Sequence, residues 1–135
     1  MLAVPAYEIP SFMLGVIPAN ADLSSESSAQ FCAVDVVTAS GAGLSGPAIA
    51  LPGAGAAALG ILQNNPVLGE AAEVMVAGVS KARLSGTVAE GALLMCDTAG
   101  KLLVATSGNQ AIAKALSSGV SGDVCPVLLK SYGKV

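Results

Sequence analysis

Apolar and polar residues alternate with a period of two along much of the chain, which is the pattern of half-buried β-strands. The segment AQFCAVDVVTA at 29–39 is rich in β-branched residues, which favour strands. The alternation places on one face Phe31, Ala33, Asp35 and Val37, and on the other Cys32, Val34, Val36 and Thr38. Residues 29–39 are therefore predicted to form a strand.

A second strand is predicted over EVMVAGVSKARL at 73–84. Its alternation sets Ser80, Ala82 and Leu84 on one side and Lys81 and Arg83 on the other. Gly78 lies in the middle of the segment, where it permits a bulge or a bend.

Further strands follow at regular intervals. ALLMC at 92–96 and KLLVA at 101–105 flank a four-residue connection, Asp97-Thr98-Ala99-Gly100, which is typical of a hairpin. AIAKAL at 111–116 fits either a strand or a single helical turn, and VCPVLLK at 124–130 is expected to close the sheet, with Pro126 indicating an edge position or a bulge. The spacing predicts a mainly β fold, an antiparallel meander or barrel.

The two regions outside this pattern have different compositions. Residues 1–28 contain Pro5, Pro10 and Pro18, which exclude a long helix, and we expect an extended N-terminal arm before a single β-rich domain at 29–135. The arm is expected to lie on a larger surface or on a neighbouring protomer, and its hypothesised contact residues are Tyr7, Ile9, Pro10 and Phe12. The Gly/Ala-rich segment 40–60 is predicted to be a long loop with short strands or a surface flap, with its alanines either making a second contact or filling the core.

Composition points to self-association. The hydrophobic fraction is 53%, but aromatic residues make up only 3%, so each core residue buries little area and an oligomer would add stability. Charged residues make up 11% of the chain and the net charge is −3, which argues against nucleic acid as a partner. Residues 1–80 carry six acids and no base, whereas residues 81–135 carry six bases and three acids. The two halves could therefore attract each other within or between protomers.

Catalytic and metal-binding motifs are missing from the sequence. Without His, Ser-His-Asp and Cys-His sites and imidazole metal sites are excluded. Cys32, Cys96 and Cys125 show no CxxC spacing and are expected to be small buried apolar residues. We expect no enzyme activity, no cofactor and no metal; a swinging-arm carrier domain that uses Lys101 is a weaker alternative, because the residues around this lysine do not match.

Membrane association and export are not expected. The most apolar stretch, at 48–62, is shorter than a membrane span and contains Pro52, Gly53 and Gly55. The N-terminus has no basic region followed by an apolar core, so no signal peptide is predicted and the chain is expected to stay in the cytoplasm where it is made.

The stretch from Leu59 to Leu129 resembles the small capsid decoration (cement) proteins of tailed phages. The matching motifs are turns and strands at Gly60 to Pro66, Gly69-Glu70, Val76 to Lys81, Gly86 to Leu93, Asp97 to Leu102 and Gly122 to Leu128. The resemblance implies a β-barrel-like or β-tulip-like domain that binds the outside of an expanded capsid. It further implies a homotrimer at three-fold and quasi-three-fold sites, which clamps neighbouring major capsid subunits.

Two other structural roles stay open. One is an oligomeric adhesion or binding module built on the same barrel, which would usually show exposed aromatic or polar clusters. The other is a tail or head-completion component, which should form rings.

Overall fold

The computed structural model describes residues 12–24, 29–40 and 43–135, and these residues form nine β-strands and no helix. Their bounds are β1 Phe12–Pro18, β2 Ala33–Thr38, β3 Pro47–Ala50, β4 Gly60–Leu62, β5 Ala71–Arg83, β6 Leu93–Cys96, β7 Leu102–Val104, β8 Gln110–Ala115 and β9 Val124–Lys134. The strands pair antiparallel in the order β3-β2-β4-β5-β9-β8-β6-β7, and β1 also pairs with β5. The predicted mainly β, barrel-like fold is confirmed.

Strand β5 belongs to two lobes, because its two halves pair with different strands. Its first half pairs with β1 and β4, and its second half, from Gly78 to Arg83, pairs with β9. Gly78 has a φ of 103°, a conformation that a residue with a Cβ rarely adopts, and it marks the position where the pairing changes. The bend expected at this glycine is therefore present.

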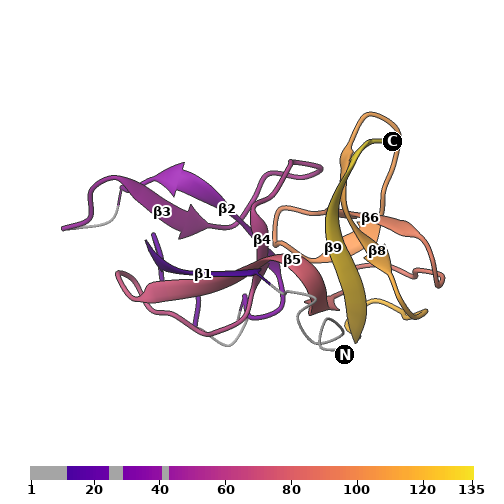
Figure 1. The fold of residues 1–135 in the computed structure, drawn as a ribbon, viewed down its shortest axis with the longest axis horizontal. Helices are drawn as coiled ribbons and strands as arrows, with labels where there is room; N and C mark the ends of the chain where they lie inside the picture. Colours follow the sequence, from indigo (N-terminus) through magenta and orange to yellow (C-terminus); the bar gives the residue numbers. More distant parts are fainter. Residues whose placement is uncertain (1–11, 25–28, 41–42) are drawn as a thin grey trace, which may run out of the picture.

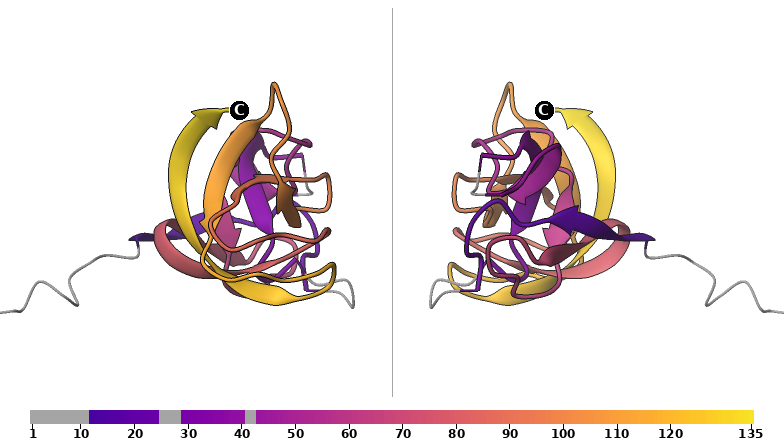
Figure 2. Two further views of the ribbon diagram at one scale, coloured as in Figure 1. Left: turned by 90° about the vertical axis from the view of Figure 1, so that its right-hand side faces the viewer. Right: turned by 90° about the vertical axis from the view of Figure 1, so that its left-hand side faces the viewer.

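Figure 1 shows the two lobes side by side, with β1, β2 and β3 in the N-terminal lobe, β6, β8 and β9 in the C-terminal lobe, and β4 and β5 between them. Figure 2 shows β9 curving along the outer side of the C-terminal lobe. Two parallel bridges draw the strand ends together, Ala19 with Ile49 in the N-terminal lobe and Leu84 with Leu102 in the C-terminal lobe. Each lobe is therefore a small, partly closed barrel.

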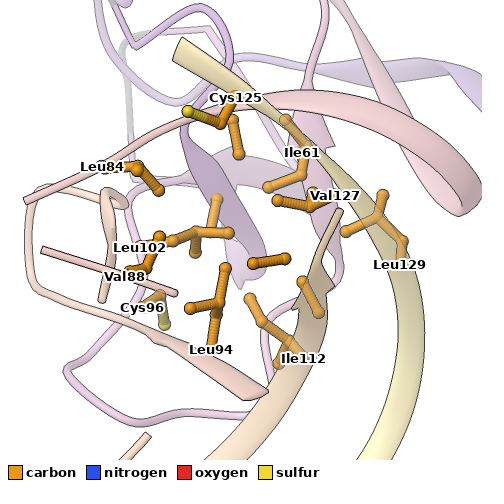
Figure 3. Close-up of a cluster of buried hydrophobic side chains, with 14 residues drawn as sticks. Ile61, Leu84, Val88, Leu94, Cys96, Leu102, Ile112, Cys125, Val127 and Leu129 are labelled. Carbon is orange, nitrogen blue, oxygen red and sulfur yellow. The ribbon is translucent and has the colours of Figure 1, made fainter. Parts of the chain in front are cut away.

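Each lobe has its own apolar core. The core of the C-terminal lobe includes Leu84, Leu94, Leu102 and Val127 (Figure 3), and the core of the N-terminal lobe includes Ile49. The wall between the cores is made by β2 and β4, because successive residues of a strand point to opposite faces. The residues that face the C-terminal core are Ala33 and Ile61, and those that face the N-terminal core are Val34 and Leu62.

The strands expected at 73–84, 92–96 and 101–105 are present, the last two as the predicted hairpin, and the segment at 111–116 is a strand. The strand expected at 29–39 is shorter, because Phe31 has a φ of 65° and the strand starts only at Ala33.

Neither expectation for Pro126, an edge position or a bulge, is met, because β9 lies between β5 and β8 and its register shift lies beyond Leu129. Pro126 is tolerated there for a local reason. Its carbonyl accepts a hydrogen bond from the Leu116 amide (3.0 Å), so the backbone of Pro126 faces β8. The proline nitrogen, which carries no hydrogen, therefore also faces β8. It does so one residue beyond Ala115, the last residue of β8 that pairs with β9.

Part of the segment assigned to an N-terminal arm is integrated into the domain. Residues 12–18 form β1, and Ala19 and Leu23 are buried in the N-terminal core. The Gly/Ala-rich segment at 40–60 contains β3 and then a loop that packs on the C-terminal lobe, where the Gly55 amide donates to the Cys96 carbonyl (2.8 Å). Ala48 is fully buried and Ala58 packs on the C-terminal core, so these two alanines fill space inside the protein.

Candidate binding surface

The second half of β5 leaves one edge without a strand partner. Val79 pairs with Leu128 and Lys81 with Pro126 across the β5–β9 ladder. The backbone groups of Pro126 face β8, so Lys81 and Pro126 form a pair without mutual hydrogen bonds. By the same alternation, the amides of Val79 and Lys81 point away from β9, toward the edge of β5 on which β4 lies.

Neither β4 nor the chain before β2 reaches these amides. The β4–β5 ladder ends at Met75, and further along β5 the Arg83 amide donates to the Phe31 carbonyl (2.8 Å). Between these two points, Val79 and Lys81 have no backbone partner on this edge within the described part of the chain. This short section is an open strand edge, to which an extended peptide can add.

A hollow of about 470 Å³ lies beside this edge. Its lining, which we call the β5 groove, consists of Phe31, Gln63, Met75, Val79, Ser80, Lys81 and Pro126. The lining is mostly apolar, contains one cation and includes no carboxylate. Val79 is 53% exposed there, so the groove leaves a β-branched apolar side chain largely in water.

Phe31 is held in the groove wall by an unusual backbone. It is the one non-glycine residue with a positive φ in the described ranges, a conformation that costs about 1–3 kcal/mol when the surroundings enforce it. Its amide donates to the Leu62 carbonyl (2.7 Å) and its carbonyl accepts from Arg83. The ring lies beneath the Lys81 ammonium, with Nζ 5.5 Å from the ring centroid, in a cation–π contact.

The polar groups in the groove floor are already paired. Ser80 is buried, and its hydroxyl accepts a hydrogen bond from Gln63 Nε2 (2.9 Å) and donates to the Lys81 carbonyl (2.9 Å). Gln63 Nε2 also donates to the Ile61 carbonyl (3.0 Å). Because the Ser80 hydroxyl and the Gln63 amide nitrogen are already hydrogen-bonded, the groove floor suits apolar contact.

The outer face of β5, β9 and β8 extends this apolar and basic character. Paired residues of an antiparallel sheet point to the same face, so the ladder registers define its members. They are Val79, Lys81 and Arg83 from β5, Val124, Pro126 and Leu128 from β9, and Lys114 from β8. No carboxylate occupies these seven positions, so the face favours an apolar partner with negative charge.

The residues that the sequence suggested for contact lie elsewhere. Phe12 is the first residue of β1 and pairs with Ala77, while Tyr7, Ile9 and Pro10 fall outside the described residues. Their contact role stays a prediction. The sequence did not predict the groove residues, because they come from four separate segments of the chain. One signal was present: Val79 lies on the same side of its strand as Lys81, which indicates an apolar residue that faces solvent.

The buried thiols and carboxylates form no reactive cluster. Cys32, Cys96 and Cys125 are free and buried, as expected from the sequence. Burial raises the pKa of the Cys32 and Cys96 thiols above the usual range, which favours the unreactive protonated form. No three His, Cys, Asp or Glu residues gather into a possible metal site within residues 12–24, 29–40 and 43–135. Over the same ranges, no helix has the length and apolarity needed to cross a membrane.

The fold is shared with a solved phage protein. The structure is similar to the head fiber gp8.5 N base of bacteriophage phi29, with a TM-score of 0.70 and 9% sequence identity. The similarity covers 92% of this chain and 98% of that chain. No protein-family model matches the sequence, and no curated protein matches it.

Proposed function

We propose that this protein is a structural component of a tailed-phage virion that binds the outer surface of the expanded capsid. There it stabilises the shell by clamping neighbouring major capsid subunits, as a homotrimer at three-fold and quasi-three-fold sites. The observation that carries the proposal is the fold shared with a phage head fiber base over almost the full length of both chains.

Two features of the chain agree with this role. The first is the series of turn and strand motifs that resemble capsid decoration proteins. The second is the uncovered apolar and basic face of β5, β9 and β8, which is suited to burial against another protein. A trimer presents three copies of each contact at once, so modest contacts combine through effective concentration into tight attachment.

Co-sedimentation with phage particles tests the proposal. Purified protein is mixed with undecorated expanded heads and with unexpanded proheads of the phage that encodes it, and its solution mass is measured by light scattering. We expect saturable binding to expanded heads at a copy number that matches the three-fold sites. Absence of binding to both particles would overturn the virion-surface role.

The N-terminal segment is expected to strengthen attachment through Tyr7, Ile9, Pro10 and Phe12. Deletion of residues 1–11 tests Tyr7, Ile9 and Pro10 and leaves Phe12 and the rest of β1 in place. We expect apparent affinity for heads to fall about tenfold or more, because the apolar anchors are lost, with an unchanged unfolding midpoint as the control. Full affinity after the deletion would contradict a contact role for the segment.

The name of the similar structure favours one alternative. That structure is the base of a head fiber, and so an oligomeric adhesion or binding module is the second candidate function. Stable oligomers that bind neither heads nor proheads would support it, and stable rings in solution would support a tail or head-completion component.

A further inference from the structure

We propose that the β5 groove binds the N-terminal segment, residues 1–11, of a second copy of this chain. The segment adds to the open edge of β5 as an extended strand, so Ala6, Glu8 and Pro10 share one of its faces. That face lies against Phe31 and Val79 and brings the Glu8 carboxylate to the Lys81 ammonium, because Val79 and Lys81 also share one face of β5. The contact joins protomers, so it stands or falls independently of attachment to a phage head.

Charge complementarity favours this occupant. Glu8 is the one charged side chain of MLAVPAYEIPS, and the rest of the segment is apolar or small apart from the hydroxyls of Tyr7 and Ser11. The groove has the complementary charge: its lining is mostly apolar and contains one cation and no carboxylate. Lys81 ends at the rim above the Phe31 ring, where its long stem lets the ammonium reach an incoming carboxylate.

Backbone chemistry agrees with an added strand. The Val79 and Lys81 amides point to the open edge of β5, and an extended peptide laid there supplies carbonyl acceptors. Pro5 and Pro10 favour extended conformations. They are an odd number of positions apart, so one of them lies with its nitrogen on the outer edge of the added strand, where it leaves no exposed N–H. Eleven extended residues span about 38 Å, enough to reach across a protomer boundary.

The geometry of β5 favours a second copy over the same chain. Since β1 and β4 both pair with β5 at Val74 and Met75, they lie on opposite edges of it. The groove is on the edge of β4, whereas the N-terminal segment leaves from the start of β1 on the other edge. To fill its own groove the segment would have to cross β5. Arm and groove are different surfaces, so the contact is head-to-tail, which is compatible with the three-fold symmetry of a trimer.

Self-association of the isolated full-length protein tests the groove. Val79→Glu places a carboxylate where Glu8 must approach, and Val120→Glu is the matched control because Val120 is equally exposed (54%) and lies outside the groove. By sedimentation equilibrium we expect the dissociation constant to rise at least about tenfold for Val79→Glu, with no change for Val120→Glu. Equal behaviour of the two variants would overturn the inference.

Charge reversal tests the pairing of Glu8 with Lys81. Glu8→Lys and Lys81→Glu should each weaken association, and the double variant should recover part of the loss. In amide hydrogen exchange, the Val79 and Lys81 amides should become protected as protein concentration rises, and should stay unprotected after deletion of residues 1–11. Absence of recovery in the double variant together with unchanged exchange would contradict the contact.

A photoreactive benzoylphenylalanine in place of Ala6, which shares a strand face with Glu8, identifies the site and the copy. We expect crosslinks from position 6 to residues 75–81 in the covalent dimer. Crosslinks to the same residues within covalent monomers would show that the segment fills its own groove, and crosslinks to any other surface would exclude the groove. Either result overturns the inference.

Discussion

At the scale of single residues, Gly100 shows how a turn becomes part of the core. It ends the β6–β7 hairpin turn with a φ of 79°, and its carbonyl accepts a hydrogen bond from the Ala33 amide (2.6 Å). A Cβ at this position would overlap the Ala33 carbonyl oxygen. Gly100 is therefore required both for its conformation and for the close approach of the turn to β2.

Gly100→Ala should destabilise the fold more than the same change at Gly122. Gly122 also has a positive φ, but a Cβ there would meet open space. We expect Gly122→Ala to cost about 1–2 kcal/mol for the backbone alone and Gly100→Ala a further 1–3 kcal/mol or so for the overlap. Chemical denaturation of both variants measures the difference, and equal losses would contradict the close approach to β2.

The buried thiols make stability depend on pH in the alkaline range. The pKa values of Cys32 and Cys96 are raised by burial in the folded state. The thiols of the unfolded chain begin to lose protons near pH 8.5, while those of the folded chain keep them. The unfolded state then binds fewer protons, so the free energy of unfolding falls as pH rises.

We expect this loss between pH 8 and pH 10, with a ceiling of about 1.4 kcal/mol per pH unit for each thiol. The double variant Cys32→Ala, Cys96→Ala should show a flatter pH profile in denaturation experiments. A profile as steep as that of the unaltered protein would mean that other groups cause the loss.

At the scale of elements, β5 decides where the candidate surface lies. Its thirteen residues bend at Gly78, so that pairing with β4 on one edge ends at Met75 and pairing with β9 on the other edge begins at Gly78. The bend opens the gap into which Val79 and Lys81 point their amides. A straight β5 with β4 continuing beside it would have no open edge and no groove.

Sequence reasoning found most of the elements through local signals. The alternation at 73–84 grouped Ser80, Ala82 and Leu84 on one side, and all three are buried. The prediction for Pro126 failed for a reason that is not local in the sequence. The neighbouring strand β8 ends there, so Pro126 needs no N–H, and the residues around Pro126 do not indicate where β8 ends. It also placed residues 12–18 in an arm, since β1 depends on a partner strand about sixty positions away.

At the scale of the whole molecule, two small cores share one wall. Ile61 and Leu62 are adjacent and fully buried, yet each enters a different core. Small cores with few aromatic residues contribute little stability separately, so the shared wall should couple the lobes into one folding unit.

Truncation of either wall residue tests this coupling. Ile61→Ala and Leu62→Ala should each cost about 2–5 kcal/mol through the cavity left behind. Both variants should still unfold in a single transition when followed by urea denaturation with probes in either lobe. Two separate transitions, with only one lobe affected, would show that the lobes fold independently.

The sequence alone determined the class of structure, because the period of two, the β-branched residues and the turn glycines are local properties of the chain. It also indicated the low charge, the buried thiols and a likeness to phage capsid proteins. Only the tertiary structure decided that β5 bends between two cores and that Phe31, Val79, Lys81 and Pro126 meet in one groove. These residues lie up to 95 positions apart, and their meeting depends on strand order and register, which arise from the packing of the whole chain.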